Sequence, residues 1–306
     1  MVTRVVSFDC EGYRLYGTLH TPRQPSSSGS GVVVLNQGPL DRSGAHRMSI
    51  KLAQRWTASG VPVLRFDARG AGESEGTWTE PAEGSPIRLL YKNIEEGAWV
   101  PDTHAAVRFL QSETGVQRVL LSGLCGGAAT ALHAGATHPS VSGILMVGMP
   151  VRLQAEVRGV KDILDSHLRT ESQRYFQRAL SLDAWKRFFS MESDYRTMLA
   201  VLAKRAEALY RRKPAQDPSL NRILMTHLRD ALRARKRLLF VYPENDYLWA
   251  EFRELFLPLF ANVADQFTVR TIAQANHTFT EPEWQRDLYE ILTAWVRAEY
   301  QQAGAA

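Results

Sequence analysis

Short apolar segments alternate with amphipathic segments along most of the chain, and this alternation constrains the fold more than any other feature. The apolar runs lack a polar face, which is typical of strands inside a sheet that helices cover on both sides. Strands that alternate with helices form a mostly parallel sheet with right-handed crossovers, so the sequence predicts an α/β fold. An antiparallel pair is expected at 5–9 and 13–20, further strands at 32–35, 61–66, 118–122, 143–147, 238–242 and 267–272, and helices at 47–59, 98–110, 128–136 and 283–300.

One long region interrupts the alternation. Residues 151–236 have helical periodicity and many arginines but contain no convincing strand. A helical insert between two strands of such a sheet usually covers the carboxyl ends of the strands, where ligands bind. We therefore expect a core formed by residues 1–150 and 237–306 and a helical cap formed by residues 151–236. A chain of 306 residues is long enough for one large domain with such an insertion.

Composition excludes several classes of protein. With 44% hydrophobic and 23% charged residues, the chain is not expected to be disordered. Two cysteines are too few for a disulfide scaffold. The first residues lack the apolar centre of a signal peptide, and no apolar run approaches the roughly 18 residues of a membrane-spanning helix. We expect a soluble cytoplasmic protein without a membrane span.

Positive charge is concentrated in the predicted cap. Residues 151–236 hold 19 Lys and Arg against 10 Asp and Glu, whereas the rest of the chain holds 18 against 22. Basic regions of this kind bind nucleic acid in some proteins, but solvated helical faces are the simpler explanation. No nucleic-acid-binding module is recognisable in the insert, and we expect no nucleic acid partner.

The segment Gly-Leu-Cys-Gly-Gly at 123–127 joins the apolar run Val-Leu-Leu-Ser to an Ala-rich helix. A strand-to-helix turn of the form G-x-S-x-G holds a nucleophile in a strained backbone conformation, and small flanking residues avoid clashes there. Gly123 and Gly127 occupy the flanking positions, and Cys125 occupies the position of the nucleophile. The dipole of the following helix favours a thiolate. The alternative interpretation is a buried, inert cysteine beside a glycine-rich turn.

A thiol nucleophile needs a base, and the base needs an acceptor that orients it. Asp246 follows the predicted strand 238–242, and His277 follows the predicted strand 267–272. Both therefore lie at the same sheet edge as Cys125, in the chain order nucleophile, acid, histidine. We predict a triad of Cys125, His277 and Asp246, with Glu244 as the alternative acid.

Acyl chemistry also needs donors for the developing oxyanion. The N–H of Gly126 is one candidate, and the loop after 32–35 supplies the second. Pro39 has no N–H, which leaves Gln37 and Gly38, and we prefer Gly38. The segment 67–74 is interpreted as a structural turn, because a phosphate-binding loop would lead directly into a helix. No histidine pair has metal-ligand spacing with further ligands, so we expect no metal and no cofactor.

These motifs resemble those of the α/β-hydrolase superfamily, within it the capped hydrolases of the serine aminopeptidase-like group. The matching segments are FDARGAGESEG, GLCGG, PEND and ANH. A closer similarity is to bacterial hydrolases associated with exosortase systems, in the segments QGPLDRSGAHR, GLCGGAATAL and RYFQRALSLDAWKRFFS. Cysteine in place of the usual serine is the departure from the superfamily pattern, and it favours thioesters and activated esters over simple esters and peptides.

The leading functional hypothesis is a thioesterase or esterase that forms an acyl-Cys125 intermediate. The alternatives are an acyltransferase or cyclase with the same triad, as in secondary metabolism, and a catalytically silent binding protein. Coenzyme A or an acidic acyl carrier protein would be attracted by the basic cap. The candidate substrate contacts are aromatic residues of the cap, namely Tyr175, Trp185, Phe188 and Phe189.

Overall fold

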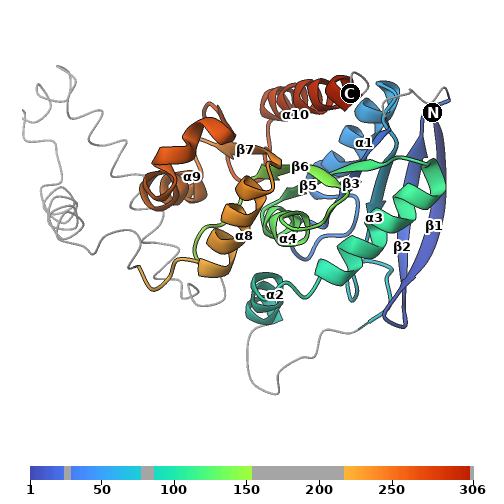
Figure 1. The fold of residues 1–306 in the computed structure, drawn as a ribbon, viewed down its shortest axis with the longest axis horizontal. Coiled ribbons are helices and arrows are strands. Elements are labelled where there is room, and N and C mark those ends of the chain that lie inside the picture. The colour runs from blue at the N-terminus through green and yellow to red at the C-terminus, as the bar shows by residue number, and fades with distance from the viewer. Residues whose placement is uncertain (24–28, 77–85, 154–216, 304–306) are drawn as a thin grey trace, which may run out of the picture.

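The computed structural model describes residues 1–23, 29–76, 86–153 and 217–303 (Figure 1). The strands of this part are β1 (Val2–Cys10), β2 (Tyr13–Thr21), β3 (Ser30–Val34), β4 (Val63–Phe66), β5 (Arg118–Leu124), β6 (Val141–Val147), β7 (Arg237–Pro243) and β8 (Thr268–Ile272). They form one eight-stranded sheet in the order β1-β2-β4-β3-β5-β6-β7-β8. β1 pairs antiparallel with β2, β2 pairs antiparallel with β4, and the strands from β4 to β8 run parallel. The predicted α/β fold is confirmed.

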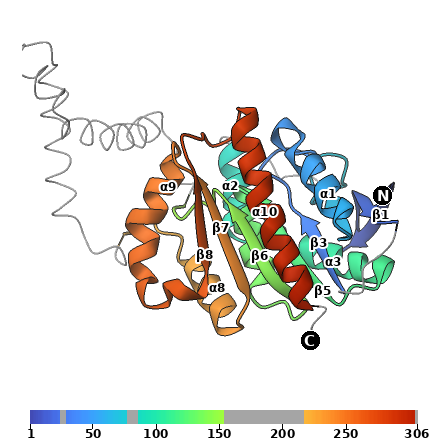
Figure 2. The same cartoon turned by 90° about the horizontal axis from the view of Figure 1, so that it is seen from above.

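Helices cover both faces of the sheet. The helices of the described residues are α1 (Met48–Ala58), α2 (Pro86–Glu95), α3 (Val100–Thr114), α4 (Gly126–Gly135), α8 (Arg222–Arg233), α9 (Tyr247–Glu251) and α10 (Pro282–Ala303). α1 and α10 lie side by side on one face, whereas α3, α4 and α8 lie on the other (Figures 1 and 2). In β3, Val32 and Val34 pack toward α1 and Val33 packs toward α3, so every side chain is buried. This double burial explains why the strands lack a polar face.

The predicted strands and helices coincide with observed ones, with differences at their ends. The third strand begins at Ser30 rather than at residue 32, because Ser30 and Gly31 still pair with β5. The helix expected from residue 128 begins at Gly126, directly after the cysteine. α2 and α9 were not predicted. α2 follows a segment rich in Gly, Pro and Glu, and α9 is only five residues long.

α8 belongs to the region predicted to form the cap, and its apolar face packs against the core. Leu224, Met225 and Leu228 are buried in the same cluster as the side chains of α4. Most of the predicted cap, residues 154–216, lies outside the described residues, so the division of the chain into core and cap stays a prediction. Each helix in the described ranges is too short or too polar to cross a membrane.

Candidate active site

Cys125 lies at the sharp turn between β5 and α4, with backbone angles φ 54° and ψ −117°. Non-glycine residues rarely adopt such angles, and they occur where the surrounding structure enforces them. A Cβ on Gly123 would lie 2.2 Å from the carbonyl carbon and oxygen of Gly127. A Cβ on Gly127 would lie 2.4 Å from the carbonyl oxygen of Asn36. Both flanking positions therefore exclude any side chain, which explains the Gly-x-Cys-x-Gly spacing.

The predicted acid and base meet at the carboxyl edge of the sheet. His277 follows β8, and its Nδ1 lies 2.6 Å from Oδ2 of Asp246, which follows β7. The Asp246 side chain is buried, and its Oδ1 accepts a hydrogen bond from the backbone N–H of Leu248 at 3.2 Å. Asp246 thus caps α9 and orients the imidazole with the same carboxylate. With Nδ1 donating to Asp246, Nε2 of His277 is the nitrogen that remains for the thiol.

The charges of the thiol and the imidazole stabilise each other. Burial raises the pKa of Cys125, but the hydrogen bond and the positive charge of His277 outweigh it and hold the pKa below its ordinary value. Burial lowers the pKa of His277, but its hydrogen bonds to Asp246 and Cys125 raise it to about 10. His277 therefore favours the thiolate form of Cys125, and Cys125 and Asp246 favour the imidazolium form of His277.

The two predicted oxyanion donors lie next to each other. Gly126 is the first residue of α4, and a Cβ on it would lie 3.6 Å from the backbone nitrogen of Gly38. Gly38 has a positive φ of 59°, which glycine adopts without strain. The side chain of Gln37 instead holds the loop together by accepting a hydrogen bond from Ala45 at 2.8 Å.

A buried carboxylate anchors the loop that carries Gly38. The side chain of Asp67, which is fully buried, accepts hydrogen bonds from the Asn36 amide at 3.2 Å and the Arg42 backbone N–H at 2.6 Å. It also pairs with the Arg42 guanidinium. Asn36 in turn accepts a hydrogen bond from the N–H of Ala68 at 2.8 Å. The segment after β4 therefore acts as a structural support for the neighbouring loop.

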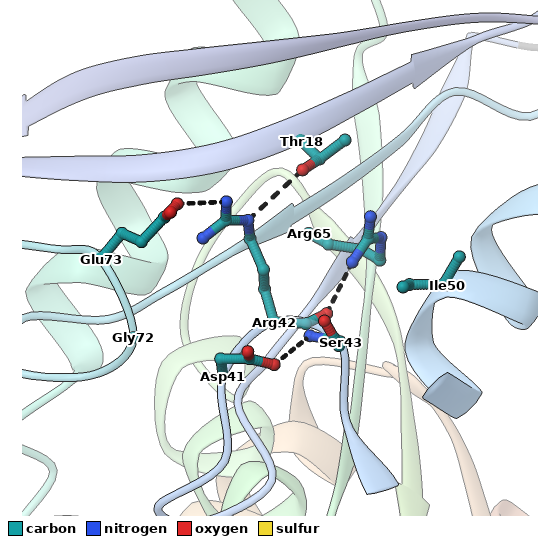
Figure 3. A pocket seen from close by; sticks show the side chains of 8 residues that line it. All are labelled: Thr18, Asp41, Arg42, Ser43, Ile50, Arg65, Gly72 and Glu73. Carbon is teal, nitrogen blue, oxygen red and sulfur yellow. Dashed lines mark hydrogen bonds and ion pairs between the residues drawn. The ribbon is translucent and has the colours of Figure 1, made fainter. Parts of the chain in front are cut away.

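Beside this anchor lies a polar pocket of about 400 Å³, which contains two arginines (Figure 3). Arg42 reaches Thr18 at 3.3 Å and pairs with Glu73. Arg65, from β4, donates to the carbonyl oxygen of Arg42 at 2.7 Å and to Nε2 of His20 at 3.1 Å. Burial and the neighbouring Arg42 lower the pKa of Arg65 to about 10. These contacts of the two arginines provide a second support, beside Asp67, for the loop that carries Gly38.

One residue at the site was not found from the sequence. The hydroxyl of Tyr91, on α2, lies 3.9 Å from Sγ of Cys125. The available signal was the spacing of Leu90 and Ile94, four residues apart, which places both on one face of a helix.

The remaining candidates lie elsewhere. Glu244 is exposed and accepts a hydrogen bond from Thr271 at 3.3 Å, whereas Asp246 is the carboxylate that contacts His277. The aromatic residues proposed to contact substrate lie outside the described residues, namely Tyr175, Trp185, Phe188 and Phe189.

Several solved structures with the same fold are named as hydrolases. A proline iminopeptidase from Mycobacterium smegmatis is 14% identical, with 99% of each chain covered and a TM-score of 0.57. An esterase from Pyrococcus furiosus is 14% identical over 97% of this chain and 91% of its own, with a TM-score of 0.59. An α/β hydrolase from Penicillium sp. sh18 is 18% identical, with both chains fully covered and a TM-score of 0.57. At these identities the likeness concerns the fold, and the fold is that of the α/β hydrolases.

The sequence of the chain matches the model of a known protein family. The model of the family described as "Serine aminopeptidase, S33" matches residues 28–283, and the chain belongs to this family. The prediction of an α/β-hydrolase-type enzyme is therefore confirmed. No curated protein matches the chain in sequence.

Proposed function

We propose that the protein hydrolyses acyl thioesters and activated esters through an acyl-cysteine intermediate on Cys125. The observation that carries this proposal is the 2.6 Å contact between His277 and Asp246 beside a thiol whose pKa is lowered by His277. Membership of a hydrolase family supports the same class of reaction. Activity in a reducing compartment such as the cytoplasm suits a thiolate nucleophile, because oxidation would inactivate it.

In the first half-reaction the Cys125 thiolate attacks the acyl carbonyl carbon. The carbonyl oxygen gains the negative charge, and the N–H groups of Gly126 and Gly38 are the proposed donors to it. When the bond to the leaving group breaks, His277 gives its proton to the departing thiolate or alkoxide. The products of this half-reaction are an acyl-Cys125 thioester and a neutral imidazole.

In the second half-reaction neutral His277 takes a proton from water, and the resulting hydroxide attacks the acyl-Cys125 carbonyl. The carbon–sulfur bond then breaks, and the sulfur leaves as a thiolate beside the imidazolium. The free acid is released, and the starting charge state is restored. Asp246 keeps the imidazole in one orientation during both proton transfers.

A thiol in place of serine favours thioester substrates. A thiolate that attacks a thioester forms another thioester, so the acylation step is nearly balanced in free energy. An alcohol or amine bound in place of water would receive the acyl group from the same intermediate. Acyl transfer and cyclisation are therefore the alternative outcomes of the same mechanism, and product analysis distinguishes them.

The test is a substrate screen with matched variants. Acyl-coenzyme A, acyl carrier protein thioesters and p-nitrophenyl esters are offered to the wild type, to Cys125→Ala and to the control Cys10→Ala. We expect turnover in the wild type and in Cys10→Ala, none in Cys125→Ala, and an acyl adduct on the Cys125 peptide by mass spectrometry. Free acid as the product supports hydrolysis, and an ester or amide formed with an added acceptor supports transfer. Turnover that survives in Cys125→Ala would overturn the mechanism.

We propose further that an anionic carrier, either coenzyme A or an acyl carrier protein, delivers the acyl group. The support is the excess of Lys and Arg in residues 151–236, which attracts anions at long range. Such attraction is screened by salt, with a Debye length of about 10 Å at 0.1 M. We expect kcat/KM for the carrier-bound substrate to fall with rising salt, while that for a neutral p-nitrophenyl ester stays constant. A salt dependence equal for both substrates would contradict charge steering.

A further inference from the structure

α2 packs directly on the turn that holds Cys125. Leu90 and Ile94 are fully buried on one face of this helix, and both belong to the main core cluster. The Cδ1 atom of Ile94 would lie 2.8 Å from a Cβ on Gly126, so the Ile94 side chain packs against the backbone at the start of α4. Figure 1 shows α2 beside this end of α4. The buried face of α2 therefore fixes the position of Tyr91, which lies between these two anchors in the sequence.

Tyr91 directs its hydroxyl at the nucleophile. The distance of 3.9 Å between the hydroxyl oxygen and Sγ of Cys125 is within reach of a hydrogen bond to sulfur, whose radius exceeds that of oxygen. A phenol is a better donor than water, and its rigid ring loses little conformational freedom when it is held in place. His277 approaches the same sulfur from the loop after β8, so donors from two separate elements converge on one atom.

We propose that Tyr91 is a catalytic residue that donates a hydrogen bond to the Cys125 thiolate in the resting enzyme and again when the thiolate leaves the acyl-enzyme. This inference rests on the proposed role of Cys125 as the nucleophile. The sulfur of a thioester carries no charge and is a weak acceptor, so acylation weakens the contact. When water attacks and the carbon–sulfur bond breaks, the electron pair returns to sulfur and the hydrogen bond strengthens. The phenolic proton stays on Tyr91 throughout.

The first test uses Tyr91→Phe, which removes the hydroxyl and keeps the ring. The rate of Cys125 alkylation by iodoacetamide is measured against pH, with Tyr13→Phe on the exposed β1–β2 hairpin as the matched control. We expect the midpoint of the profile to rise by about 0.5 to 1 pH unit in Tyr91→Phe, which lowers the thiolate fraction three- to tenfold below the midpoint. The profile of Tyr13→Phe should superimpose on that of the wild type.

A second variant makes the test independent of any loss of packing. Incorporation of 3-fluorotyrosine at position 91 keeps the hydroxyl and makes it a stronger donor, so the midpoint should move down rather than up. Deacylation gives a further readout, because Tyr91→Phe should accumulate acyl-Cys125 during turnover of a p-nitrophenyl ester while kcat falls several-fold.

The outcomes separate the two proposals. A wild-type Cys125 that reacts no faster than a free thiol at neutral pH would overturn the proposed nucleophile itself. A reactive wild-type Cys125, with Tyr91→Phe and fluorotyrosine profiles that superimpose on it, would overturn the role of Tyr91 and leave the proposed function standing. A lower melting temperature in Tyr91→Phe with an unchanged alkylation profile would mean that Tyr91 only packs.

Discussion

Cys10 ends the strand β1 and packs beside Asp102 and Glu11, whereas Cys125 directly precedes α4 and lies beside His277. Burial disfavours the thiolate at both positions, so burial alone does not distinguish them. At Cys10 the negative charge of Asp102 acts in the same direction as burial, and together they raise the pKa to about 11. At Cys125 the imidazole of His277 acts against burial and holds the pKa below its ordinary value.

The difference between the two cysteines is therefore set by the net effect of the neighbouring charges. Cys10 also has a neighbouring cation, since the guanidinium of Arg69 lies 3.5 Å from its sulfur. That cation already pairs with Asp102 at 2.6 Å and with Glu11 at 2.8 Å, which offsets its effect on the thiol. His277 has one carboxylate partner, Asp246, and faces the thiol with its remaining nitrogen. The cation beside Cys10 is shared by two carboxylates and the cation beside Cys125 by one, so only the second lowers the pKa of its thiol below the ordinary value.

His277→Ala should abolish the difference between the two sites and have the largest effect. Without the imidazole, burial and the negative charge of Asp246 remain, so the pKa of Cys125 should rise above its ordinary value as it does at Cys10. We expect kcat/KM to fall by roughly 10⁵- to 10⁶-fold, as for the removal of a triad base. The measurement is turnover of the best ester or thioester, together with iodoacetamide labelling at neutral pH. Retention of rapid Cys125 labelling would contradict the assignment of His277.

Asp246→Asn should have a smaller effect than loss of the imidazole. Asparagine still caps α9, but it no longer supplies the charge that orients and stabilises the imidazolium. We expect a loss of activity roughly ten- to a hundredfold smaller than that in His277→Ala. The matched control is Glu244→Gln, which alters an exposed carboxylate two residues earlier and should leave kcat unchanged. If Glu244→Gln were the more damaging of the two, Glu244 would be the acid.

The wild-type chain should be alkylated at one cysteine at neutral pH. The thiolate fraction of Cys125 far exceeds that of Cys10, although a thiolate of lower pKa is intrinsically less nucleophilic. The balance of these effects gives a rate ratio of roughly ten to a hundred in favour of Cys125. Peptide mapping after a short pulse of iodoacetamide measures the ratio, and the single-cysteine variants Cys10→Ala and Cys125→Ala verify each rate. Similar labelling of both peptides would contradict the electrostatic contrast.

The sequence predicted those site residues that follow the ends of strands. Cys125, Asp246 and His277 each lie within a few residues of the carboxyl end of a strand, and parallel strands bring such positions to one edge. Tyr91 escaped prediction because its contact with Cys125 depends on how α2 packs on α4, which the spacing of Leu90 and Ile94 does not specify.

The same limit applies to α8. The helical periodicity of residues 151–236 predicted helices in this region, but periodicity does not identify the surface that a buried helix face covers. In α8, Leu224 and Leu228 pack in the core cluster. The local sequence pattern therefore predicted most strands and helices and the sheet edge at which the candidate site lies. The contacts between helices could be identified only in the structure.

Glu11→Gln should change the reactivity of Cys10 by the smallest amount. Glu11 raises the pKa of Cys10, and it also pairs with the guanidinium of Arg69, whose charge lowers that pKa. Removing the Glu11 carboxylate therefore lowers the pKa of Cys10 in two ways, because a negative charge is lost and the charge of Arg69 is less neutralised. Burial and Asp102 still have the larger effects on this pKa. In a Cys125→Ala background we expect Cys10 alkylation at pH 9 to rise by about two- to threefold, because a shift of a few tenths of a pH unit changes the thiolate fraction by that factor.

Asp9→Asn is the control, since Asp9 pairs with Arg14 at 2.7 Å and is absent from the charges that act on Cys10. Access to the buried sulfur cancels in the ratio between variants of equal stability, so an unchanged or lower rate in Glu11→Gln would mean that burial and Asp102 keep Cys10 inert without a contribution from Glu11.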